Sequence, residues 1–196
     1  MGYSKTNISS STAAVTNRFV TSVNMKVGAY TLANTTASHG AGFTLTATIT
    51  PVTGNDTAGT LVVVGKNLAG QAVTETITLT AGSGGTGTQV FKSLTSITGA
   101  GWVINTGNDT IIVGQAADAY VMASSGELYA VVVNTAQATS IALADAGGTF
   151  ATLKASIVEG TYYYHVNVGG YLKVTHAGTA NFTLLHTSTQ PVYTAT

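Results

Sequence analysis

The stretch Phe-Thr-Leu-Thr-Ala-Thr-Ile-Thr at residues 43–50 places an apolar residue at every odd position and threonine at every even one. Because successive side chains of a β-strand point to opposite faces, this alternation predicts a strand with one face in a core and one face of hydroxyl groups. Charged residues are scarce in the whole chain and make up only 7% of it. A surface of hydroxyls with few like charges can pack against copies of itself with little electrostatic repulsion.

Outward from residues 43–50, short apolar or alternating runs recur along the chain, separated by turns rich in glycine. They predict further strands at 61–64, 73–79, 90–98, 110–113, 127–133, 140–144, 150–156, 162–168, 171–175 and 181–187. In the second half, turns such as Gly147-Gly148 and Gly169-Gly170 recur near the spacing of an all-β sandwich. The sequence therefore predicts an all-β fold with two antiparallel β-sandwich-like domains preceded by an extended N-terminal arm.

Changes in residue composition and periodicity along the chain predict the domain boundaries. Residues 1–22 lack regular periodicity and form the expected arm, residues 23–117 the first sandwich domain, residues 118–125 a linker, and residues 126–196 the second sandwich domain. The arm has few apolar side chains to offset the entropy of ordering its own backbone. We therefore expect it to be disordered in the free protein and ordered against a neighbouring molecule, the alternative being a dispensable tail.

The composition excludes several classes of partner. Seven Lys+Arg residues balance seven Asp+Glu residues, so the chain offers no electrostatic footprint for nucleic acid or for an anionic membrane surface. The absence of cysteine excludes disulfides and thiolate metal sites. No apolar run reaches the length of a membrane-spanning helix, and the first residues lack the apolar core of a signal peptide. We expect synthesis in the cytoplasm.

No sequence pattern predicts catalysis. His165 and His176 flank a Gly-Gly turn, but a third metal ligand at a fixed spacing is missing. No serine lies in a Gly-x-Ser-x-Gly turn, and the scattered acids leave no carboxylate pair for glycoside hydrolysis. The glycine-rich loop at 81–87 lacks the Lys-Ser/Thr and the helix of a phosphate-binding loop. We expect no catalytic residue, no cofactor and no metal.

Aromatic residues are the remaining candidates for a functional site. Tyr162-Tyr163-Tyr164 places tyrosines on both faces of one strand, so a core cannot hide all of them. Tyr163 is predicted at an interface, with His165 on the same face, whereas Trp102 is expected in the core. The candidate contacts with a partner or another subunit are Tyr3, Lys5, Arg18, Phe19, Tyr163 and His165.

Two parts of the chain resemble modules of tailed-bacteriophage virion proteins. The first part is Gly-Thr-Leu-Val-Val-Val-Gly at 59–65, Gly-Gln-Ala-Val-Thr-Glu-Thr-Ile-Thr-Leu at 70–79 and Val-Phe-Lys-Ser-Leu-Thr-Ser-Ile at 90–97. The second part runs from Glu-Leu-Tyr at 127–129 through Ala-Thr-Leu-Lys-Ala-Ser-Ile-Val-Glu-Gly-Thr-Tyr at 151–162, and is similar to a module of phage structural proteins. Together they cover most of residues 59–187. The resemblance implies a capsid decoration, or cement, protein and names no catalytic residues.

The resemblance implies a non-enzymatic role in which the protein binds the capsid exterior, bridges major capsid protein subunits and stabilises the shell by mass action. The expected location is the virion, after synthesis in the host cytoplasm. Self-association is also expected, with a trimer favoured because it suits three-fold positions of an icosahedral shell. Two different roles stay open: a tail, neck or head-fibre component, and a carbohydrate-binding adhesin module with Tyr163, Tyr164 or Trp102 as a stacking platform.

Overall fold

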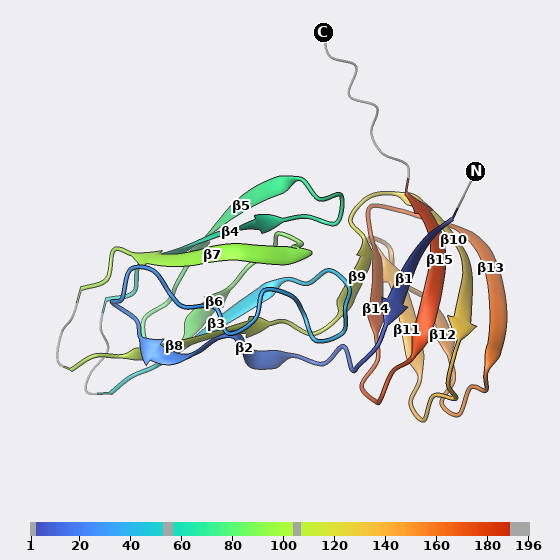
Figure 1. The fold of residues 1–196 in the computed structure, drawn as a ribbon, viewed down its shortest axis with the longest axis horizontal. Coiled ribbons are helices and arrows are strands. Elements are labelled where there is room, and N and C mark those ends of the chain that lie inside the picture. The colour runs from blue at the N-terminus through green and yellow to red at the C-terminus, as the bar shows by residue number, and fades with distance from the viewer. Residues whose placement is uncertain (1–2, 53–56, 104–106, 189–196) are drawn as a thin grey trace, which may run out of the picture. The chain divides into compact units, whose positions relative to one another are not determined.

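The computed structural model describes residues 3–52, 57–103 and 107–188, and every regular element in these ranges is a β-strand (Figure 1). Strands make up 58% of the protein and form four antiparallel sheets, which confirms the predicted all-β fold. The sheets divide between two compact units. Among the described residues, unit 1 holds 3–13, 38–41 and 118–188, and unit 2 holds 14–37, 42–52, 57–103 and 107–117.

Unit 2 contains one sheet of order β2-β8-β3-β6 and one of order β5-β4-β7. Its strands are β2 (Val15–Asn24), β3 (Leu45–Thr50), β4 (Thr60–Lys66), β5 (Ala72–Thr78), β6 (Gly84–Thr86), β7 (Ser93–Ala100) and β8 (Thr110–Gln115). The alternation at 43–50 acts as predicted, because Leu45, Ala47 and Ile49 are buried while Thr48 is exposed. Side chains from both sheets enter one apolar core, which makes the unit sandwich-like.

Unit 1 contains one sheet of order β1-β15-β10-β13 and one of order β12-β11-β14-β9. Its strands are β1 (Ser4–Ile8), β9 (Ala119–Met122), β10 (Gly126–Val133), β11 (Ile141–Asp145), β12 (Gly148–Leu153), β13 (Gly160–Val168), β14 (Leu172–Thr175) and β15 (Phe182–Ser188). Both sheets again contribute to a single core. Figure 1 shows the four strands of the first sheet side by side, with the N-terminal strand β1 at its edge.

The structure departs from the expected arm at 1–22, of which residues 1 and 2 lie outside the described part. Strand β1 pairs with β15 in unit 1, and β2 pairs with β8 in unit 2. The segment is ordered on its own chain because Ile8, Phe19 and Val20 are completely buried there. Each such burial contributes about 1.5–3 kcal/mol, and pairing with neighbouring strands satisfies the backbone.

The structure also departs from the expected linker at 118–125, since β9 lies within it. Ala119, Val121 and Met122 are buried in the core of unit 1, and β9 pairs with β14. A four-residue strand is too short to leave a clear periodic pattern in the sequence. The chain nevertheless passes for the last time from unit 2 to unit 1 between Ala117 and Asp118, where the linker was expected to begin.

Candidate functional site

One face of the β1-β15-β10-β13 sheet brings together most of the predicted contact residues. The strand register aligns Lys5, Leu185, Ala130 and Tyr163 in a row across the four strands. Directly opposed residues share a face of a sheet, so this row lies on one side. Tyr163 is 63% exposed, which shows that this side is the outer one. Its neighbours along the strand, Tyr162 and Tyr164, pack against the core instead, as the alternation predicts.

A double irregularity in the register places Tyr129 at the centre of this outer face. Between Leu128 and Ala130, β10 has one residue more than β15, and that residue is Tyr129. Opposite the same point, β13 has one residue more than β10, and His165 has a φ of 50°. A left-handed backbone is uncommon outside glycine, and β-bulges of this kind redirect side chains.

The aromatic rings on this face contact one another. The Tyr3 and Tyr129 rings stack with centroids 4.2 Å apart, and the His165 ring meets Tyr129 edge-on at 4.4 Å. The Tyr163 ring lies edge-on to Tyr129 at 5.6 Å and is nearly parallel to His165 at 6.2 Å. We name these four residues the tyrosine surface. Edge-on and offset contacts between rings are favourable, so the tyrosine surface is partly fixed in shape.

Glu127 adds an acidic group to the margin of the tyrosine surface. Its Oε1 lies 3.5 Å from His165 Nδ1, and both side chains are partly exposed, so the two groups form an ion pair when the histidine is protonated. Desolvation raises the pKa of Tyr3, and the charge of Glu127 raises this pKa further. An exposed ion pair of this kind contributes little to the stability of the fold.

The sequence analysis missed two members of this site, Tyr129 and Glu127. Both lie at alternate positions of the predicted strand 127–133, which was the available signal. Of the predicted contacts, Tyr3, Tyr163 and His165 belong to the tyrosine surface, and Lys5 lies on the same face of the sheet.

Arg18 and Phe19 belong to unit 2 and not to this sheet. Phe19 is completely buried and stacks on Phe43 with ring centroids 4.8 Å apart, so its side chain is already occupied within the chain. The Arg18 guanidinium donates a hydrogen bond to the Thr36 carbonyl over 3.0 Å. Both therefore anchor the start of unit 2. Trp102, expected in the core, packs against it as a partly buried side chain.

The other histidines are buried and have hydrogen-bonding roles. The ring nitrogens of His176 lie 3.0 Å from the Ser140 carbonyl oxygen and 3.2 Å from that of Thr179. His186 Nε2 lies 3.0 Å from the Thr6 hydroxyl, and burial lowers the pKa of His186. His39 Nδ1 accepts a hydrogen bond from the amide of Ala41.

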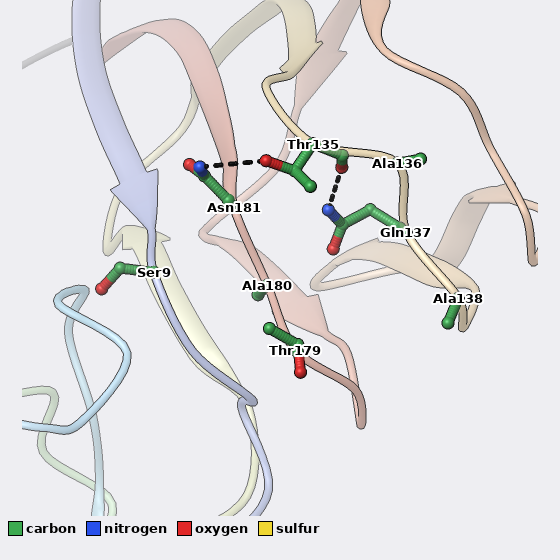
Figure 2. A pocket seen from close by; sticks show the side chains of 8 residues that line it. All are labelled: Ser9, Thr135, Ala136, Gln137, Ala138, Thr179, Ala180 and Asn181. Carbon is green, nitrogen blue, oxygen red and sulfur yellow. Dashed lines mark hydrogen bonds between the residues drawn. The ribbon is translucent and has the colours of Figure 1, made fainter.

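A hollow of about 470 Å³ lies in unit 1 beside the loops that precede β11 and β15 (Figure 2). The buried Gln137 amide donates to the Thr135 carbonyl, and Asn181 Nδ2 donates to Thr135 Oγ1 over 3.3 Å. The Gln137 Oε1 has no partner among the described residues. Alanines, threonines and amides line the hollow without a charged group, so it suits water or a small neutral molecule and offers no catalytic pair.

The described residues contain no group of three His, Asp or Glu side chains able to hold a metal ion. Several acids are engaged in local bonding. Asp145 accepts hydrogen bonds from the amides of Gly147 and Gly169, and Asp118 pairs with Lys173 at 2.8 Å. Within the same ranges, no helix is present that is long and apolar enough to cross a membrane.

The comparisons with protein-family models, curated proteins and solved structures return no match for this chain. The assignment of the fold and of the candidate site therefore rests on the structure alone. They describe an all-β protein of two sandwich-like units, one of which carries an exposed, partly preformed aromatic surface.

Proposed function

We propose that this protein is a non-enzymatic virion structural protein, which binds the outer surface of a tailed-phage capsid and stabilises the shell. The single observation that carries the binding role is the tyrosine surface. The resemblance of residues 59–97 and 127–162 to phage virion modules supports the virion as its location. The major capsid protein is the proposed partner.

The tyrosine surface has the properties of a protein-binding site. Tyr163 is 63% and Tyr3 41% exposed, so a partner can cover a large ring area at each. Tyrosine is enriched in protein interfaces because a rigid ring combines apolar area with a polar tip and loses little conformational entropy. The flanking Glu127 and Lys5 provide rim charges of opposite sign, which set orientation more than affinity.

A binding role agrees with the internal hydrogen bonds and ion pairs in which the polar side chains take part. The buried histidines hold strands and loops together, and the acids described above bond to backbone amides or to a lysine. A protein bound across the boundary of two capsid subunits adds its binding free energy to the closed shell and needs no chemistry. Self-association on the shell, with a trimer at three-fold positions, belongs to the same proposal and rests on shell geometry.

A carbohydrate-binding module is the second candidate, and the arrangement around Tyr163 is the observation that favours it. The exposed Tyr163 ring lies on the same face as Glu127 and Asn167, whose positions pair across β10 and β13. Ligand sites commonly combine aromatic or apolar side chains with a small number of polar groups. On this second hypothesis, the protein would attach the virion to a carbohydrate on the cell surface.

The test removes the protein gently from virions that carry it and then adds the purified protein back. We expect stripped heads to release DNA at a lower temperature than intact ones, and the added protein to restore the original release temperature. Intact heat resistance with loss of cell attachment would replace the capsid role with the carbohydrate-binding one. A purified protein that hydrolyses a polysaccharide or peptide would contradict both.

A further inference from the structure

The edges of the four sheets differ in how well they are protected against pairing with another strand. The eight edge strands are β1, β13, β12 and β9 in unit 1 and β2, β6, β5 and β7 in unit 2. An edge strand presents unpaired amides and carbonyls, and natural proteins protect such edges by bulges, charges, short length or covering segments. An unprotected edge is therefore a sign of an interaction site.

Seven of these edges carry such protection. Register irregularities interrupt β13, β12, β9 and β2. Strands β6 and β1 have only three and five residues, and β1 carries Lys5. The segment 28–35 covers β7, where backbone hydrogen bonds join Tyr30 to Ile97, Gly28 to Gly99 and Thr35 to Leu94.

Among the described residues, strand β5 has no bulge and no covering strand, and its one charged residue, Glu75, is hydrogen-bonded to backbone amides of the same chain. Its seven residues pair with β4 in an unbroken register, from Ala72 opposite Lys66 to Thr78 opposite Thr60. The strand contains no lysine, arginine or proline. Among the described residues, no backbone hydrogen bond reaches β5 from the side away from β4. Figure 1 shows β5 as the outermost strand of its sheet.

The register also shows which backbone groups of β5 point to the free edge. The Leu79 amide donates to the Gly59 carbonyl over 3.1 Å, so this pair is of the hydrogen-bonded kind. Hydrogen-bonded and non-hydrogen-bonded pairs alternate in an antiparallel ladder. The even-numbered residues Ala72, Thr74 and Thr76 therefore direct both their amides and their carbonyls away from β4.

Thr78 closes the free stretch at one end. A Cβ built on Gly85 of β6 would lie 2.7 Å from the Thr78 carbonyl oxygen, so β6 already occupies that position. The one carboxylate of the strand is engaged within the chain, since Glu75 Oε1 accepts hydrogen bonds from the amides of Thr88 and Gln89. The free edge thus runs from Ala72 to Thr76, with exposed threonine side chains and no competing charge.

We propose that β5 pairs antiparallel with β5 of a second copy of this chain, around a two-fold axis at Thr74. This register sets Thr74 opposite the second copy's Thr74 and Ala72 opposite its Thr76, so all three free residues find partners at once. It places Val73 opposite Glu75 and keeps the two Glu75 side chains from facing each other, a contact that would be unfavourable. Paired threonines are favourable in such ladders.

Two further features select a second copy as the occupant. The free stretch is self-complementary in this register, and the chain has no net charge to keep copies apart. The result is a continuous sheet of order β7-β4-β5-β5-β4-β7, an isologous interface in which each residue contact occurs twice. The pairing does not rest on the proposed capsid role, and its two-fold symmetry distinguishes it from a trimer.

The test is sedimentation velocity of the full chain from micromolar to near-millimolar concentration. We expect a concentration-dependent dimer, and we expect Thr74→Lys to weaken it by at least about tenfold, because the substitution places two like charges at the axis. The matched control is Thr98→Lys, which adds the same charge on an exposed position of β7, the covered edge of the same sheet. It should leave the dimer intact.

A second variant keeps the test decisive if Thr74→Lys does not fold. The chain has no cysteine, so Thr74→Cys introduces one thiol per copy. Opposed residues in a ladder have Cα atoms about 5.5 Å apart, within the range that a disulfide spans. Mild oxidation should give covalent dimers of Thr74→Cys and none of Thr98→Cys. A monomer at every concentration, a trimer, or a dimer that Thr74→Lys leaves unchanged would overturn the proposal.

Discussion

The two units are both sandwich-like, but they differ in where their aromatic side chains lie and in which of them contains histidine. Unit 2 hides its rings, with Phe43 between Phe19 and Phe91 at the centre of the core. Unit 1 exposes tyrosines on a sheet face and contains all four histidines of the chain. Unit 2 offers a backbone edge at β5 instead. If the tyrosine surface binds a partner as proposed, recognition by side chains resides in unit 1, whereas unit 2 offers the backbone edge of β5.

The largest expected effect is on the core of unit 2. Phe43→Ala removes the central ring of the three-phenylalanine stack and leaves a cavity, which should lower the free energy of unfolding by about 3–5 kcal/mol. Trp102 is the only tryptophan and packs against this core, so its fluorescence during chemical denaturation reports the change. Phe150→Ala, on an exposed ring of unit 1, is the matched control. An unchanged tryptophan transition in Phe43→Ala would contradict the assignment of this core.

A smaller effect is expected from a buried hydroxyl of unit 1. Thr12 Oγ1 accepts a hydrogen bond from the His176 amide over 2.7 Å and is itself fully buried. Thr12→Val leaves that amide without a partner and should cost about 1–3 kcal/mol of stability. Thermal unfolding followed by far-ultraviolet circular dichroism measures the loss, with the exposed Thr16→Val as control. Equal stabilities for the two variants would contradict the role given to Thr12.

The alternating pattern at 43–50 shows how much of the fold the sequence reveals. Strict alternation identified β3, and it placed Tyr163 and His165 outward on β13. The β-bulge at Tyr129 could not be seen, because strict alternation in 127–133 would put Tyr129 on the same face as Val131. The bulge separates them, and Val131 enters the core while Tyr129 lies outside.

Short and irregular strands explain the remaining differences. Strand β9 has four residues and β6 three glycine-rich ones, too few for a periodic signal. Strand β2 pairs with β8 through two register shifts, so its apolar residues do not alternate. The contact of Tyr3 with Tyr129 joins positions far apart in the chain, which only the pairing of β1 with β15 and of β15 with β10 brings together.

The pH dependence of stability should separate the two units. Burial lowers the folded-state pKa of His186, so below its unfolded value of about 6.5 the unfolded chain binds more protons than the folded one. The stability of unit 1 should therefore be complete above about pH 6.5 and fall as the pH drops below it. Unit 2 has no histidine, so the Trp102 transition should stay constant between about pH 7.5 and pH 5.5.

The control for this pH effect is His186→Gln, which keeps a hydrogen-bonding group near Thr6 and removes the titration. Its unit 1 transition, followed by tyrosine near-ultraviolet circular dichroism, should lose most of the slope between about pH 6.5 and pH 5.5. A slope that persists in this variant would assign the effect to another group of unit 1.

The smallest effect on stability is expected at the tyrosine surface itself. Tyr163 is an exposed side chain on the outer face of an edge strand, so Tyr163→Ala should change the free energy of unfolding by no more than about 0.5 kcal/mol. Urea denaturation of the variant and of the unmodified protein measures the difference. A loss comparable to that of Thr12→Val would mean that the ring supports the fold and is not held out for a partner.

The proposed capsid contact is tested most directly by the binding of Tyr3→Ala/Tyr163→Ala to stripped virions. The comparison is Phe150→Ala, whose exposed ring lies on the other sheet of unit 1. If the tyrosine surface contacts the capsid, the double variant should fold normally and bind at least about tenfold more weakly, because exposed tyrosines at an interface often dominate its affinity. The Phe150→Ala control should occupy virions like the unmodified protein. Equal occupancy by the double variant would contradict the proposal that the tyrosine surface contacts the capsid.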